Sequence, residues 1–95
     1  MSIRVMSRII DNSQDLNVKG NELLALLLLA DKANDEGLSW PSMGTLARQM
    51  NIERKSVQRI LSGLQGKHLI DTVSRFTEAG RQTSNTYQIR IPRGG

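Results

Sequence analysis

The sequence contains no cysteine and only one histidine, His68, among its 95 residues. The lack of cysteine excludes disulfide bonds and thiolate metal sites. A single histidine cannot build a histidine-rich metal cluster, and the serine, histidine and aspartate residues lack the sequence context of a nucleophile elbow. We therefore predict that the protein is not an enzyme, holds no metal and uses no cofactor.

Long hydrophobic runs are also missing. The longest apolar run, Leu23 to Ala30, has eight residues, whereas a membrane-spanning helix needs about 20. The N-terminus has no apolar segment of the kind found in secretory signal peptides. These absences predict a cytoplasmic protein with no membrane partner.

The composition is that of one soluble domain, with 38% hydrophobic and 23% charged residues, but the charge is unevenly distributed. Residues 1–40 carry four basic and six acidic residues, a net charge of −2. Residues 41–95 carry nine basic and three acidic residues, a net charge of +6. The positive excess therefore lies in the C-terminal half. Such a distribution fits a surface for a polyanion, although a solvated basic surface would look the same.

The N-terminal third contains an ambiguous segment and then a leucine-rich helix. Residues 1–16 fit either strand alternation or helical spacing, and we expect an N-terminal arm or short extra element there. A helix is predicted from about Val18 to Asn34. Its leucines cover more than one face, so it is either central to the core or shared with a partner. The arm and this helix leave a homodimer open.

Two further helices are predicted next, separated by a short turn. Ser42 is a good N-cap for a helix that ends near Met50. Asn51 to Glu53 forms a three-residue turn whose Ile52 is expected to fill a gap in the core. The second helix runs from about Arg54 to Gly66, with Gly and Lys at its end.

The remainder is predicted to form a β-hairpin. Leu69 to Arg75 and Asn85 to Ile91 are rich in β-forming residues and are joined by a polar loop, and residues 92–95 are read as a linker or tail. Helix, turn, helix and hairpin together predict an α+β, mainly α fold: a winged helix-turn-helix of about three helices plus a C-terminal β-hairpin wing, over residues 17–91.

The helix from Arg54 to Gly66 is expected to have two different faces. At about 100° per residue, Val57, Ile60, Leu61 and Leu64 form one apolar stripe, and the polar residues lie opposite or beside it. Arginine, lysine, glutamine and serine suit the hydrogen-bonding edges of bases in the major groove. An ordinary solvated face would carry more acidic residues for i,i+4 pairing. The predicted recognition-helix contacts are Arg54, Lys55, Ser56, Gln58, Arg59 and Ser62.

Other polar residues are assigned to the DNA backbone and to the wing. The preceding helix carries hydroxyl, guanidinium and amide groups near or off its apolar face, which suit phosphate contacts that set the register. The predicted backbone contacts are Ser42, Thr45, Arg48 and Gln49. The predicted wing contacts are Arg75, Arg81, Gln82, Thr83 and Asn85.

Several short motifs resemble one known family. They are Ala-Asp-x-Ala-Asn-Asp-x-Gly, Trp-Pro-Ser and Thr-Leu-Ala within residues 23–70, and Gly-Arg-x-Thr-Ser-Asn-x-Tyr within residues 80–89. Together they resemble the winged-helix module of phage and plasmid replication proteins, the N-terminal domain of replication protein O-like initiators. Two residues depart from that pattern: Glu53 replaces the usual serine-like N-cap, which weakens the phosphate contact expected there, and Gly44 softens the start of its helix.

The resemblance implies sequence-specific double-stranded DNA binding in replication initiation, at an origin or its iterons, in a prokaryotic cell or its phage or plasmid host. It also implies a replication-machinery partner recruited through a further C-terminal region. Transcriptional repression or centromere binding in plasmid partition would use the same surface. A winged helix that binds an acidic protein is a further alternative.

Overall fold

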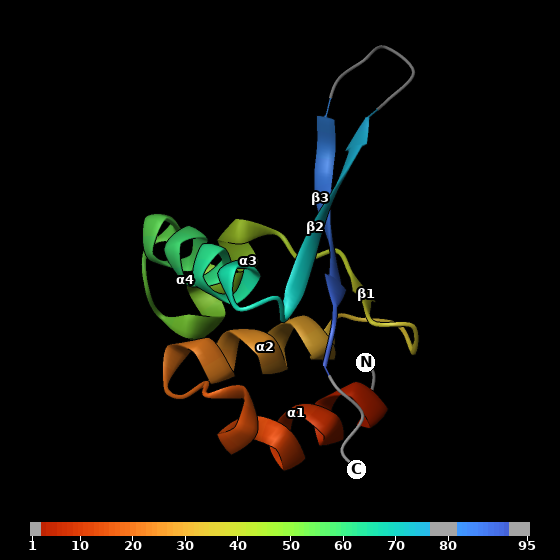
Figure 1. The fold of residues 1–95 in the computed structure, drawn as a ribbon. Coiled ribbons are helices and arrows are strands. Elements are labelled where there is room, and N and C mark those ends of the chain that lie inside the picture. Colours follow the sequence, from red (N-terminus) through yellow and green to blue (C-terminus); the bar gives the residue numbers. More distant parts are fainter. Residues whose placement is uncertain (1–2, 77–81, 92–95) are drawn as a thin grey trace.

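The computed structural model describes residues 3–76 and 82–91, with side chains for residues 3–72 and 86–91. Within these residues the chain forms four helices and three strands (Figure 1). The helices are α1 (Ile3–Leu16), α2 (Asn21–Asp31), α3 (Met43–Met50) and α4 (Arg54–Gly66), and the strands are β1 (Leu38–Ser39), β2 (Ile70–Phe76) and β3 (Gln82–Ile89). The predicted winged helix-turn-helix fold is confirmed, with α1 as an additional helix.

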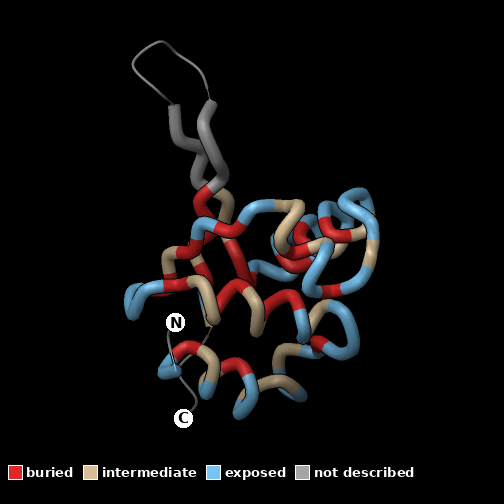
Figure 2. The backbone as a smooth tube through the Cα atoms, turned by 180° about the vertical axis from the view of Figure 1, so that it is seen from behind, coloured by how far each residue is buried: buried red, intermediate tan, exposed pale blue. Residues whose placement is uncertain are grey.

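The leucine-rich helix α2 lies at the centre of the molecule. It passes between α1 on one side and the α3–α4 pair on the other (Figure 1). Ala25, Leu26, Leu29 and Ala30 are fully buried. Leu23, Leu27 and Leu28 are partly buried against the same core, and Leu24 is 37% exposed. Burial on several sides explains why this helix has no polar face. Figure 2 shows this burial along the backbone, with the buried segments turned toward the centre of the molecule.

The ambiguous N-terminal segment is a helix because its apolar residues pack on α2 at helical spacing. Val5 and Ile9, four residues apart, are buried in the core, whereas Ile3 and Ile10 are 70% and 57% exposed. The helix ends where Asn17 adopts a left-handed conformation with φ of 57°, which asparagine tolerates better than most residues. Val18 is then buried, so the next helix begins at Asn21, three residues later than predicted.

Local hydrogen bonds define the predicted helix-turn-helix. The Ser42 Oγ accepts a hydrogen bond from the Thr45 N–H at 3.0 Å and caps α3 as expected. At its other end Asn51 is left-handed, and the Ile52 N–H donates to the Ala47 carbonyl at 3.0 Å. Ile52 is partly buried against the core. The three-residue turn therefore brings α4 into place through both backbone bonding and apolar packing.

Helix α4 has the predicted bounds but ends in an unexpected way. The residue that leaves the helical conformation is His68, with φ of 61°, and the Leu69 N–H donates to the Leu64 carbonyl at 3.1 Å. Gly66 remains helical. The only histidine of the chain thus occupies the left-handed position in which glycine is commonest.

The hairpin belongs to a three-stranded antiparallel sheet in the order β1-β3-β2. The sequence did not predict β1, whose two residues pair with Gln88 and Tyr87 of β3. Its Ser39 is buried and donates to the Leu29 carbonyl at 2.8 Å, which connects the sheet to α2. Strands β2 and β3 rise beside the α3–α4 pair and project beyond it (Figure 1).

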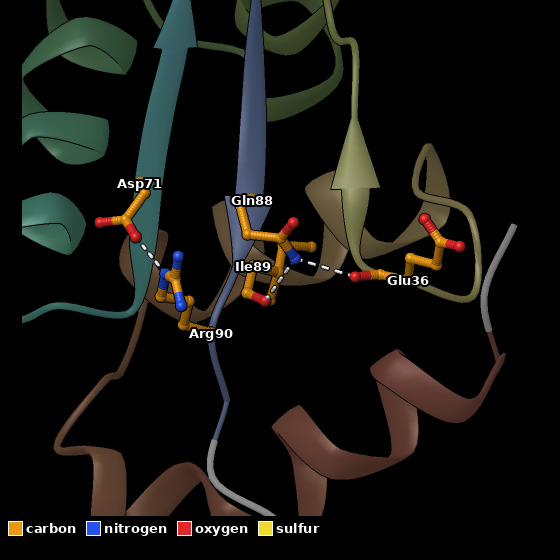
Figure 3. A network of polar contacts seen from close by, with 5 residues as sticks. All are labelled: Glu36, Asp71, Gln88, Ile89 and Arg90. Carbon is orange, nitrogen blue, oxygen red and sulfur yellow. Dashed lines mark hydrogen bonds and ion pairs between the residues drawn. The ribbon is translucent and has the colours of Figure 1, made fainter.

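A polar network closes the base of this sheet (Figure 3). The Gln88 side-chain amide donates to the Glu36 carbonyl at 2.8 Å, and Arg90 pairs with Asp71 across β3 and β2. Gly37, the residue after Glu36, has a φ of +84°, and a Cβ there would be 3.0 Å from the Gln88 amide nitrogen. Glycine is required at this position because of both its conformation and the close approach.

Candidate nucleic-acid interface

Helix α4 separates apolar and polar residues as its sequence predicts. Val57, Leu61 and Leu64 are buried, and Ile60 is partly buried against the core. Five of the six predicted recognition residues are exposed, and the sixth, Ser56, is partly exposed. The exposed ones are Arg54, Lys55, Gln58, Arg59 and Ser62. The polar face is therefore available to a ligand along most of the helix.

The basic side chains of this face make no ion pairs with the part of the protein whose side chains are described. In the described part of the chain, ion pairs are made by Lys32, Lys67 and Arg90. The arginine and lysine side chains of α3 and α4 make none of them, and only one acidic residue, Glu53, lies between residues 42 and 62. With four basic residues, that segment has a net charge of +3. Cations without protein partners are suited to a polyanion.

The predicted backbone contacts on α3 divide into two groups. Arg48 and Ser42 are exposed and Thr45 is partly exposed, and the Ser42 hydroxyl donates to the Thr45 hydroxyl at 3.0 Å. Gln49 is different, because its Oε1 accepts a hydrogen bond from the Lys32 ammonium at 2.7 Å. This bond connects the end of α3 to the end of α2 and gives Gln49 a structural partner that its sequence position did not reveal.

A surface depression of about 790 Å³ lies between the first turn of α3 and the start of α4. Arg48, Arg54 and Thr45 line it together with Ser42 and Glu53. Glu53 is the N-cap residue of α4, but its side chain makes no capping hydrogen bond. The depression thus gathers two guanidinium groups and two hydroxyls from both helices of the motif, with one carboxylate at its edge.

A second, smaller crevice joins α4 to the base of the wing. It has a volume of about 200 Å³ and is lined by Gln58 and Ser62 of α4 and by Thr72 and Tyr87 of the sheet. The Thr72 hydroxyl donates to Gln65 Oε1 at 3.1 Å. This bond holds the exposed face of α4 in a defined position relative to β2.

The predicted wing residues are located only in part. The backbones of Arg75, Gln82, Thr83 and Asn85 lie in β2 and β3, where Gln82 pairs with Phe76 and Asn85 with Ser74 across a register shift. Their side chains, and Arg81 altogether, lie outside the described residues. The wing contacts therefore remain predictions.

The described part of the chain contains neither a metal-binding cluster nor a membrane-spanning helix. No group of three or more histidine, cysteine, aspartate or glutamate side chains there is arranged to hold a metal ion. None of the helices found there combines the length and the apolar character needed to cross a bilayer.

Comparison with known proteins agrees with this geometry. The solved structure of a protein from Methanosarcina mazei Go1, described as a "possible transcriptional regulator", superposes with a TM-score of 0.59 over 86% of this chain and 65% of its own, at 17% identity. Protein YmfN from Escherichia coli K12 is 30% identical over 67 residues, which cover 70% of this chain and 15% of YmfN. The chain thus corresponds to a small part of that relative.

A family match covers both helices of the helix-turn-helix, α3 and α4. Residues 16–70, from the end of α1 to the first residue of β2, match the helix-turn-helix domain family. Neither relative's name refers to replication, so the narrower replication-protein resemblance remains a prediction. The match spans more than half of the sequence and contains both helices of the candidate interface. The chain therefore belongs to the helix-turn-helix domain family.

Proposed function

We propose that this protein binds double-stranded DNA sequence-specifically, with the exposed face of α4 in the major groove and α3 against the backbone. The observation that carries the proposal is the polar face of α4, whose arginine and lysine side chains have no ion pairs in the described part of the chain. Membership of a helix-turn-helix family supports it. An α-helix with its side chains is about 10–12 Å in diameter, which fits a major groove about 12 Å wide.

The proposal is tested by selecting bound duplexes from a random pool and measuring their affinity by fluorescence anisotropy. We expect one enriched sequence motif and an affinity that falls by about 0.9 log units per log unit of salt for each phosphate contacted. An affinity that does not depend on salt, or no binding to any duplex at 50 mM salt, would refute DNA binding. Binding of an acidic protein through Arg59 without any duplex affinity would favour the protein-interaction alternative.

The biological role proposed first is replication initiation, supported by the motif resemblance in residues 23–70 and 80–89. Transcriptional regulation is the second candidate because the M. mazei protein with the same fold is described as a possible regulator. Footprinting on the DNA around the gene separates them. Repeated sites at an origin support replication, an operator over a promoter supports repression, and repeats that stabilise plasmid inheritance support partition.

A homodimer is proposed as the binding form because α1 leaves Ile3 and Ile10 exposed, seven residues apart on one side of the helix. Two-fold half-sites in the selected DNA would require such a dimer. Sedimentation equilibrium of the wild-type chain and of an Ile3→Ser/Ile10→Ser variant checks this. A monomer at micromolar concentration that binds a single half-site would refute it.

A further inference from the structure

Gly44, in the first turn of α3, is in unusually close contact with a residue of the next helix. A Cβ built on Gly44 would lie 2.8 Å from Arg54 Nη2 and 3.6 Å from its guanidinium carbon. A contact under about 3 Å between a Cβ and a nitrogen is a steric clash, so alanine at this position would displace the Arg54 side chain. The guanidinium reaches across the turn onto α3 because residue 44 has no side chain.

The position of this guanidinium bears on what Arg54 contacts. Its nitrogen lies over the α3 backbone and lines the same depression as Arg48 and Thr45, so it points back from the outward face of α4. In the part of the chain that the structure describes, it makes no ion pair, even with the adjacent Glu53. Two guanidinium groups and a hydroxyl on one depression form a donor set for a phosphate group, whose oxygens accept several hydrogen bonds at once.

The sequence placed Arg54 among the base-reading residues and gave Gly44 only a weakening effect on its helix. The contact between them indicates different roles for both. We propose that Gly44 is a positioning residue that holds Arg54 across α3, where Arg54 and Arg48 together bind one phosphate of the DNA backbone. This inference rests on the proposed DNA binding and assigns two roles within the DNA-binding surface. Arg54 sets the register on the backbone, whereas Arg59 and its neighbours read bases.

The fold itself does not require glycine at position 44. Gly44 is helical, its φ lies outside the left-handed region, and the atom that a methyl group would meet is the end of a flexible side chain. Alanine is the better helix former. A Gly44→Ala variant should therefore melt at the same temperature as wild type or up to about 6 °C higher.

The test is a double-mutant cycle on the selected duplex, with Gly44→Ala, Arg54→Ala and the double variant. Losing the Arg54 guanidinium from this phosphate should lower the affinity by up to about eightfold at 0.1 M salt and reduce the salt slope by up to about 0.9. We expect Arg54→Ala to show this loss with an unchanged base preference. Gly44→Ala should lose roughly threefold or more, and the double variant should bind no more weakly than Arg54→Ala.

The matched control is Gly66→Ala, the same substitution in the last turn of α4, where an added Cβ meets nothing within 4 Å. It should bind DNA like the wild type. The inference is overturned if Gly44→Ala binds like the wild type, or if Arg54→Ala changes the preferred base at one position. A further loss from Gly44→Ala in the Arg54→Ala background would also overturn it, because the methyl group would then obstruct the DNA directly. Absence of wild-type binding to any duplex would instead refute the proposed function itself, and this inference with it.

Discussion

The two ends of helix α4 use their positive charges in different ways. At the C-terminal end, the Lys67 ammonium donates to Glu22 Oε1 and to the Asn17 carbonyl, both at 2.9 Å. At the N-terminal end and along the outer face, Lys55 and Arg59 have no ion pair in the described residues. The same type of charge is thus part of the fold at one end of the helix and available to a partner along the rest.

This difference follows from what surrounds each end. Lys67 faces the junction between α1 and α2, which belongs to the acidic N-terminal part of the chain. Arg59 is exposed to solvent, in a segment where the only carboxylate is Glu53. One end of α4 thus has an ion-paired cation, and the rest of the helix has cations without ion pairs in the described residues. Two substitutions can therefore remove the same charge at different positions.

The largest effect, on the free energy of unfolding, is expected from a substitution in the buried apolar face of α4. Leu64 is fully buried in the core, and Leu64→Ala should lower the free energy of unfolding by about 2–5 kcal/mol. Urea denaturation measures this change. Whatever DNA binding the variant loses should return when the temperature is lowered enough to refold it. A Leu64→Ala protein of wild-type stability would contradict the core packing described above.

Arg59→Ala should have the next largest effect, on binding alone. It should weaken DNA binding by about 1–3 kcal/mol and relax the preference at one base pair, because it removes a base-edge contact. Unfolding free energy should stay within about 0.5 kcal/mol of wild type, since the side chain is exposed. Competition anisotropy against duplexes that vary at single positions measures both aspects. A uniform loss over all sequences would assign Arg59 to the backbone instead.

Much of this surface could be predicted from the sequence because helical periodicity is local. The spacing of Val57, Leu61 and Leu64 was sufficient to predict which side of α4 is buried, and the Ser42 cap predicted where α3 begins. The bounds of α4 and the hairpin pairing likewise follow from local signals and agree with the structure.

Features that depend on distant partners were not predictable in the same way. Residues 3–16 became a helix through packing on α2, and β1 exists only because two residues pair with β3. The Lys32–Gln49 hydrogen bond joins residues 17 positions apart. The Arg54–Gly44 contact needs the turn geometry to bring the side chain over α3. The spacing in residues 3–16 left strand and helix open, and the other three contacts leave no periodic signal in the sequence.

Lys67→Ala sharpens the comparison because it removes the same charge from the same helix as Arg59→Ala. The side chains of Lys67 and its partner Glu22 are 34% and 28% exposed, so the pair is partly hydrated. We expect a loss of about 0.5–1 kcal/mol in unfolding free energy, as for other partly exposed pairs. DNA affinity should be nearly unchanged, measured side by side with Arg59→Ala. Equal losses of affinity in both variants would mean that overall charge, not position, controls binding.

Glu53→Gln should give the smallest effect, in the opposite direction. Glu53 lines the depression with Arg48 and Arg54, its side chain caps no helix, and it makes no ion pair in the described residues. It therefore repels a phosphate placed there without contributing a contact to the fold. Neutralising it should tighten DNA binding by about 0.2–1 kcal/mol at low salt, and the gain should shrink as salt screens the charge. Glu22→Gln, which removes a carboxylate that already pairs with Lys67, should not tighten binding to the same extent. A loss of affinity in Glu53→Gln would show that this carboxylate accepts a hydrogen bond from the DNA or orders the start of α4, and would exclude a purely repulsive role.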